Sequence, residues 1–261
     1  MPHLNAARLL VCGLLMGAAA CAPVGSAPPL KFAVQGASSV DEHDLAADLV
    51  SHAYETLRSA EFRRNLLSLR KSHPTVFARR HEQDLPLEQV VELSAAGRYF
   101  PVRIVLAGSD PNDEDYEIAG AAGVGHPGGA VRIRIGRGVL ADYRSIDLVE
   151  RSCAINTMAH ELTHAISRTP VIFSRAFQDT RRGDERIPGR RDPTSAVASY
   201  LIGSVAQCTW LQQQGRITHG GFSDCVRVFG ARSFNFRRCD AFPGSRGVHL
   251  TLDTPDANSQ L

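Results

Sequence analysis

The sequence predicts an α+β domain that is mostly helical and carries a small β-sheet. Apolar residues recur at helical spacing over 40–70 and 147–167, and an uncharged segment over 194–214 is long enough for a buried helix. Two shorter segments, 99–107 and 130–135, alternate apolar with other residues as strands do. A chain of 261 residues, 43% hydrophobic and 21% charged, is long enough to bury one sizeable core.

The boundaries of the smaller elements are marked by turn residues. A short helix over 85–96 is opened by Pro86 and closed by Gly97, the positions where these residues commonly start and stop helices. The strand over 99–107 ends at the turn-rich GSDPND. Residues 120–129 are rich in glycine and are expected to form a loop between the two strands.

The N-terminal residues predict export. An apolar run over 9–20 has the size of a signal-peptide core and ends in Ala18-Ala19-Ala20-Cys21. The small residues before Cys21 resemble the lipobox of bacterial lipoproteins, in which this cysteine is lipidated. Soluble secretion and an uncleaved anchor remain alternatives, because Ala18 stands where the lipobox usually has Leu. The expected domains are a signal peptide over 1–20, a lipid-anchor tether over 21–35, a folded domain over 36–242 and a loose C-terminal tail over 243–261.

Charge and hydropathy exclude or disfavour other classes. The 29 Lys and Arg nearly balance the 27 Asp and Glu, for a net charge of +2, and the arginines are scattered along the chain. Nothing in this balance indicates a nucleic-acid partner. Beyond residue 20 no apolar run approaches the roughly 20 residues of a membrane-spanning helix, which excludes a polytopic membrane protein.

The motif HELTH at 160–164 carries the chemistry. Residues four apart lie on the same helix face, so the imidazoles of His160 and His164 can reach one Zn2+ ion. Glu161 lies about 100° round the helix from His160, where it can act as general base on a zinc-bound water. The neighbouring residues are uncharged, as a buried catalytic helix requires. We therefore prefer zinc binding to a purely structural role for the two histidines.

The segment NTMAHELTHA over 156–165 resembles the zincin metallopeptidases and is most similar to the aspzincin, or deuterolysin-like, branch. The resemblance implies a zincin-like domain over 36–242, in which the motif helix lies beneath a sheet whose edge strand binds extended peptide. The strand over 130–135, just ahead of the helix, is expected to be that edge.

The aspzincin resemblance also implies a third zinc ligand, an Asp in a Gly-Thr-x-x-Asp-x-x-Tyr-Gly type segment. Asp179 is in register with that Asp, but the Gly-Thr is missing and Arg182 replaces the Tyr that stabilises the oxyanion. Asp179 is the preferred third ligand. Tyr200 and Asp192 are the alternatives, although Asp192 precedes a helix and is better suited to cap it.

The helix predicted over 194–214 is expected to pack closely on the motif helix. It contains no acid, unlike the second helix of a gluzincin, and has small residues at one face (Ala196, Ser199, Gly203 and Ala206). Tyr200 borders this face, so its hydroxyl can ligate zinc or donate to an oxyanion. A buried core tyrosine is the equally simple alternative.

In an exported chain the four cysteines beyond Cys21 are expected to form two disulfides, out of three possible pairings. If the two helices run antiparallel, Cys153 and Cys208 fall at the same end. We therefore expect the pairs Cys153–Cys208 and Cys225–Cys239.

The sequence thus predicts a zinc-dependent endopeptidase of the bacterial cell envelope, held on the periplasmic side through a lipidated Cys21 and acting on protein or peptide substrates. Glu161 and Tyr200 are the expected catalytic residues, and His160, His164 and Asp179 the expected metal ligands. The alternative is a non-catalytic envelope lipoprotein in which a zincin-like fold serves binding or scaffolding.

Overall fold

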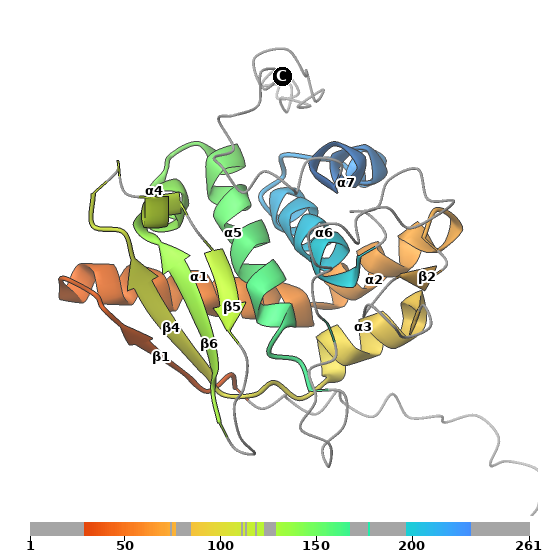
Figure 1. The fold of residues 1–261 in the computed structure, drawn as a ribbon. Helices are drawn as coiled ribbons and strands as arrows, with labels where there is room; N and C mark the ends of the chain where they lie inside the picture. The colour runs from red at the N-terminus through yellow and green to blue at the C-terminus, as the bar shows by residue number, and fades with distance from the viewer. Residues whose placement is uncertain are drawn as a thin grey trace, which may run out of the picture.

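The computed structural model describes residues 29–73, 75–76, 85–110, 112, 114–117, 119–122, 129–167, 177 and 197–230. These residues form an α+β fold, as predicted (Figure 1). The elements in chain order are β1 (Phe32–Gln35), α1 (Val40–Arg58), α2 (Ala60–Ser68), a 3-10 turn (Leu69–Lys71), β2 (Thr75–Val76), β3 (Leu85–Pro86), α3 (Leu87–Ala96), β4 (Val102–Ala107), a second 3-10 turn (Glu114–Glu117), β5 (Ala119–Ala122), β6 (Val131–Gly136), α4 (Arg137–Arg144), α5 (Leu148–Thr163), α6 (Ala198–Gln213) and α7 (Phe222–Gly230).

The main sheet has the strand order β1-β4-β6-β5. The first three strands are parallel, and β5 pairs antiparallel with β6 at one edge. The expectation that the 130–135 strand forms the edge is wrong, because β6 is paired on both sides. The segment expected to be a glycine-rich loop begins instead with the last residues of β5, which is the edge strand beside β6.

The folded domain starts earlier than predicted. The sequence places residues 32–35 in the tether, but they form β1 and pair with β4 over four residues, from Phe32 opposite Val102 to Gln35 opposite Val105. The domain boundary at residue 36 is therefore wrong. The tether can extend from Cys21 only to about Lys31.

The helical pattern over 40–70 forms two helices rather than one. Ser59 adopts an extended conformation, accepts a hydrogen bond from the backbone N–H of Phe62 and caps α2. The apolar spacing changes at the same point, because Phe62 follows Leu57 by five residues whereas the earlier apolar residues recur every four. The change in apolar spacing from four residues to five therefore marks the boundary between α1 and α2 in the sequence.

The apolar face of the sheet is covered by helices. Figure 1 shows α1 crossing behind the sheet and α5 running beside it. Ile104 of β4 and Ile133 and Ile135 of β6 are fully buried in the core that these helices share. The residues alternating with them, Arg103 and Arg132, are exposed on the opposite face of the sheet.

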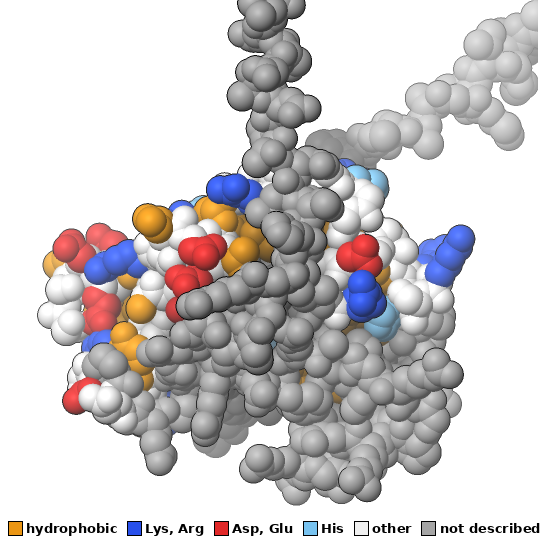
Figure 2. All heavy atoms as spheres, turned by 90° about the horizontal axis from the view of Figure 1, so that it is seen from above, with side chains coloured by type: hydrophobic (Ala, Val, Ile, Leu, Met, Phe, Trp, Pro, Cys, Tyr) orange, Lys and Arg blue, Asp and Glu red, His pale blue; other side chains and the backbone are white. Residues whose placement is uncertain are grey.

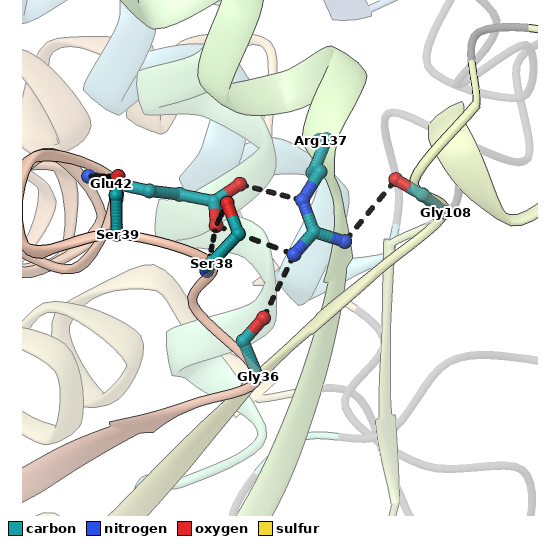
Figure 3. A network of polar contacts seen from close by, with 6 residues as sticks. All are labelled: Gly36, Ser38, Ser39, Glu42, Gly108 and Arg137. Carbon is teal, nitrogen blue, oxygen red and sulfur yellow. Dashed lines mark hydrogen bonds and ion pairs between the residues drawn. The ribbon is translucent and has the colours of Figure 1, made fainter.

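Arg137 fastens the ends of the parallel strands together (Figure 3). Its guanidinium donates to Glu42 Oε1 at 2.5 Å, to the carbonyl of Gly36 at 2.7 Å and to that of Gly108 at 3.4 Å. Gly36 and Gly108 follow β1 and β4 with φ of 79° and 66°, the left-handed region that favours glycine. Burial alone would raise the pKa of Glu42, but hydrogen bonds from Arg137 and Ser38 outweigh it and lower that pKa.

Candidate metal centre

Helix α5 carries the site and ends within the motif. Asp147 caps its first turn by accepting a hydrogen bond from the N–H of Val149 at 2.8 Å. The helix ends at Thr163, and His164 is its C-cap with helical backbone angles (φ −70°, ψ −14°). His164 therefore still lies one turn beyond His160 on the same face. The following residues pair with the chain before β4, where Phe100 N–H donates to the Ala165 carbonyl at 2.8 Å.

The structure brings the three predicted motif residues together in a buried group. One potential ligand atom from each of His160, Glu161 and His164 lies within 4.8 Å of the others. Their exposed fractions are only 1%, 2% and 4%. Nε2 of His160 lies 3.9 Å from Oε1 of Glu161, so the carboxylate reaches the nitrogen that would face a metal. Burying such polar groups is costly unless they share a ligand or hydrogen bonds.

His164 has a partner that suits a metal ligand. Its Nδ1 lies 3.4 Å from the backbone carbonyl of Phe177, which accepts a hydrogen bond when Nδ1 carries the proton. In that tautomer Nε2 keeps its lone pair for a cation. Phe177 is itself fully buried. Two imidazoles and a nearby carboxylate form a nitrogen and oxygen donor set of the type that zinc accepts.

Tyr200 lies beside the motif, as predicted. Its ring centroid is 4.6 Å from that of His160, with an angle of 45° between the ring planes. His164 contacts the His160 ring edge-on at 5.2 Å. The three rings therefore form one cluster between α5 and α6, and Tyr200 is 9% exposed.

A buried polar network holds α6 against α5. Gln207 accepts from Asn156 Nδ2 at 2.7 Å and donates to Ser152 Oγ at 2.9 Å and to Cys153 Sγ at 3.3 Å. The exposed fraction of Gln207 is zero. Sequence reasoning missed Gln207 and Asn156 because uncharged polar residues in a helix carry no spacing signal of their own.

Gly203 sets the distance between the helices. A Cβ at this position would lie 2.4 Å from Asn156 Oδ1, 3.1 Å from the Asn156 carbonyl and 3.2 Å from Cβ of His160. Gly203, one of the small residues predicted for this face, thus lies against α5 as expected, and Ala196 lies outside the described residues. Contacts of Cys153 with Gln207 and of His160 with Tyr200 show that the two helices run antiparallel.

The predicted disulfide pairing is wrong. Cys208 is bonded to Cys225 and not to Cys153. The Cys208–Cys225 bond joins α6 to α7 across a sequence separation of 17 residues. Cys153 is also in a disulfide, whose other half lies outside the described residues. Cys153 and Cys208 do lie at the same end of the antiparallel helix pair, as predicted. The residue of α6 that contacts Cys153 is Gln207, however, and not Cys208. Cys208, about 100° further round the helix, faces α7 instead.

The other candidate residues of the site, Asp179, Arg182 and Asp192, lie outside the described residues. Within the described part of the chain, His160, Glu161 and His164 are the one group of three or more His, Cys, Asp or Glu that could hold a metal ion.

Comparison of the chain with protein families, curated proteins and solved structures finds no match. Among the described residues, no helix combines the length and the apolar character needed to cross a membrane. The family expected from the HELTH segment stays a prediction, and the residues of the site alone support the function proposed next.

Proposed function

We propose that this chain is an exported, zinc-dependent endopeptidase of the zincin type. The observation that carries the proposal is the buried group formed by His160, Glu161 and His164 at the end of α5. Two histidines and a glutamate are costly to bury side by side, and a shared metal ion is one arrangement that offsets this cost.

In this proposal His160 and His164 hold the metal through Nε2, and a third residue completes the set. Asp179 remains the preferred third ligand. It follows Phe177 by two residues, and the Phe177 carbonyl lies 3.4 Å from His164 Nδ1. Two residues span at most about 7 Å, so Asp179 is joined to the site by a short connection. Tyr200 and Asp192 are the alternative ligands.

Bound zinc would supply a Lewis acid that acidifies water and polarises a peptide carbonyl. Glu161 then takes the proton of the attacking water, which its buried position beside His160 Nε2 permits. It later passes that proton to the departing amine. Tyr200, whose ring lies against His160, is the proposed donor to the negative charge that develops on the carbonyl oxygen.

The substrate class is proposed from the sheet. Strand β5 uses one side to pair with β6, and within the described residues its other side has no strand partner. An extended peptide can add to such a free edge through main-chain hydrogen bonds. The four residues of β5 are Ala, Gly, Ala and Ala. For the cellular site we propose the envelope, with Cys21 lipidated.

The experiment compares Glu161→Gln with wild type in the chain from Ala22 onward. Zinc content is measured by elemental analysis, and hydrolysis is followed with fluorophore-labelled denatured casein. We expect one zinc per chain in both proteins and loss of turnover in the variant by at least a hundredfold, the usual contribution of a general base. The matched control is Glu55→Gln, which makes the same substitution at an exposed position of α1. This variant should hydrolyse casein as wild type does.

Loss of zinc from Glu161→Gln would instead make Glu161 a ligand. Unchanged turnover would refute its role as base. A folded wild-type chain that binds zinc but leaves casein intact, with Glu161→Gln indistinguishable from it, would favour the non-catalytic envelope lipoprotein.

A further inference from the structure

The exposed face of the main sheet carries arginines in neighbouring strands. Arg103 of β4 lies directly opposite Arg132 of β6, and Arg134 follows one row further along β6. Arg134 is paired with Asp115. Arg103 and Arg132 are both exposed, and within the described part of the chain neither forms an ion pair. Two like charges on adjacent strands repel one another, so the fold gains nothing from this arrangement, and a binding role offers an explanation for it.

The charged residues in the segments around this face are all positive. The segments that enter and form the three parallel strands, 29–35, 97–107 and 129–136, contain no Asp or Glu, and their cations are Lys31, Arg98, Arg103, Arg132 and Arg134. The whole chain has a net charge of only +2. The face seen from above in Figure 2 differs, because acidic and basic side chains are mixed on it. The arginines lie about thirty positions apart in sequence, so only the strand register brings them together.

Arg103 and Arg132 lie near the N-terminal ends of the parallel strands, at the end of the sheet where the proposed tether joins β1. Arg103 and Arg132 are the second residues of β4 and β6, in the same row as Ala33, the second residue of β1. Neighbouring strands are about 4.8 Å apart, so both arginines lie within about 10 Å of the start of β1. Lys31, directly before β1, is exposed as well.

The length of the tether limits how far this face can lie from the membrane. Residues 22–31 separate Cys21 from β1, which is ten residues. Ten residues span at most about 35 Å when fully extended and about 18 Å on average as a flexible coil. With Cys21 in the lipid layer, the start of β1 cannot move further than this from the membrane surface. The tether therefore allows the arginines to come within about 8 to 10 Å of that surface, the range over which charges interact in physiological salt.

We propose that the arginine face of the sheet, formed by Arg103 and Arg132 with Lys31 at the start of β1, docks on an anionic membrane surface and binds its phosphate groups. The inference rests on the lipidation of Cys21 proposed above, and it is independent of the zinc site. Guanidinium groups suit phosphate because they donate two parallel hydrogen bonds. A membrane surface is favoured over an acidic protein because the lipid anchor already keeps this end of the sheet near the membrane. Docking on this face directs the opposite face of the sheet, with α1 and α5, away from the lipid.

The test measures vesicle binding by the chain from Ala22 onward, which keeps every described residue but lacks the apolar leader. Vesicles of phosphatidylcholine alone are compared with an equal mixture of phosphatidylcholine and phosphatidylglycerol. Wild type should sediment with the anionic vesicles only, and less so as salt is raised. Each basic residue near such a surface contributes about fivefold in affinity, so Arg103→Gln with Arg132→Gln should weaken binding by about 25-fold.

The matched control removes the same charge elsewhere. Arg63 and Arg64 are exposed on α2, and Arg63→Gln with Arg64→Gln should leave vesicle binding within about twofold of wild type. Equal losses in the two double variants, or equal binding to neutral and anionic vesicles, would overturn the proposal. Binding of soluble polyglutamate, with the same dependence on Arg103 and Arg132 but no vesicle binding, would assign the face to an acidic protein instead. Zinc content is measured in every variant and should not change, so failure here is separable from failure of the metal site.

Discussion

Two adjacent positions of α6 should respond in opposite directions to alanine. Gly203 lies where α6 and α5 approach most closely, and an added Cβ would meet Asn156 and Cβ of His160. Ser204, the next residue, is fully buried, and its hydroxyl has no hydrogen-bond partner within the described part of the structure. Gly203→Ala adds one atom to a full space, whereas Ser204→Ala removes one polar atom that gains nothing from its position.

The expected magnitudes follow from those contacts. Overpacking a tight contact costs about 1 to 3 kcal/mol. For Gly203→Ala we expect a cost in the upper half of this range. The added Cβ would lie 3.1 Å from the Asn156 backbone carbonyl, and the nearer Asn156 side chain is held in place by its hydrogen bond to Gln207. The higher helix propensity of alanine returns about 1 kcal/mol. The free energy of unfolding should therefore fall by about 1 to 2 kcal/mol in Gly203→Ala and rise by about 1 kcal/mol in Ser204→Ala.

Urea denaturation with linear extrapolation measures both values. A zinc-competition titration with a chelator on the same samples tests the site, because displacement of α6 pushes on His160 and should weaken zinc binding in Gly203→Ala alone. A Gly203→Ala chain that is as stable as wild type would refute the close approach of the two helices. A Ser204→Ala chain that loses stability would show that the hydroxyl has a partner.

Further predictions concern other described contacts. Replacing both Cys208 and Cys225 by alanine should lower the free energy of unfolding by about 3 kcal/mol, because the bond closes a loop of 17 residues; an unshifted urea midpoint would contradict this. The lowered pKa of Glu42 means that its ion pair with Arg137 stabilises the fold above the ordinary value of 4.5 and that this contribution is lost as the pH falls through the lowered pKa. Thermal denaturation at pH 3 to 7 should therefore show a weaker acid dependence in Glu42→Gln than in wild type, and an unchanged dependence would place the titration elsewhere.

The helices around the site could be predicted from the sequence because their signals are local. The HELTH spacing fixes which side chains share a face of α5, and the small residues of α6 predict close packing. The structure bears out both, with His160, Glu161 and His164 grouped and Gly203 against His160.

The sheet and the cross-links could not be predicted in the same way because they depend on contacts between distant segments. Strand β5 consists of alanine and glycine, so it has neither alternation nor β-branched residues to mark it, and the sequence predicts a loop there instead. The disulfide prediction is wrong because Gln207, and not the next residue Cys208, faces Cys153. Sequence spacing alone does not resolve which of two adjacent helical residues faces a given neighbour. The opposed arginines of β4 and β6 become visible only once the register is known.

The most direct test of the central claim is the zinc content of the purified chain from Ala22 onward. Wild type and His43→Ala, which changes a half-exposed histidine of α1, should each hold one zinc per chain. His164→Ala should hold none, and loss in Asp179→Ala as well would identify the third ligand, whereas retention there would move it to Tyr200 or Asp192. A folded wild-type chain that takes up no zinc when zinc is supplied, or a His164→Ala chain that keeps it, would contradict the proposed metal centre.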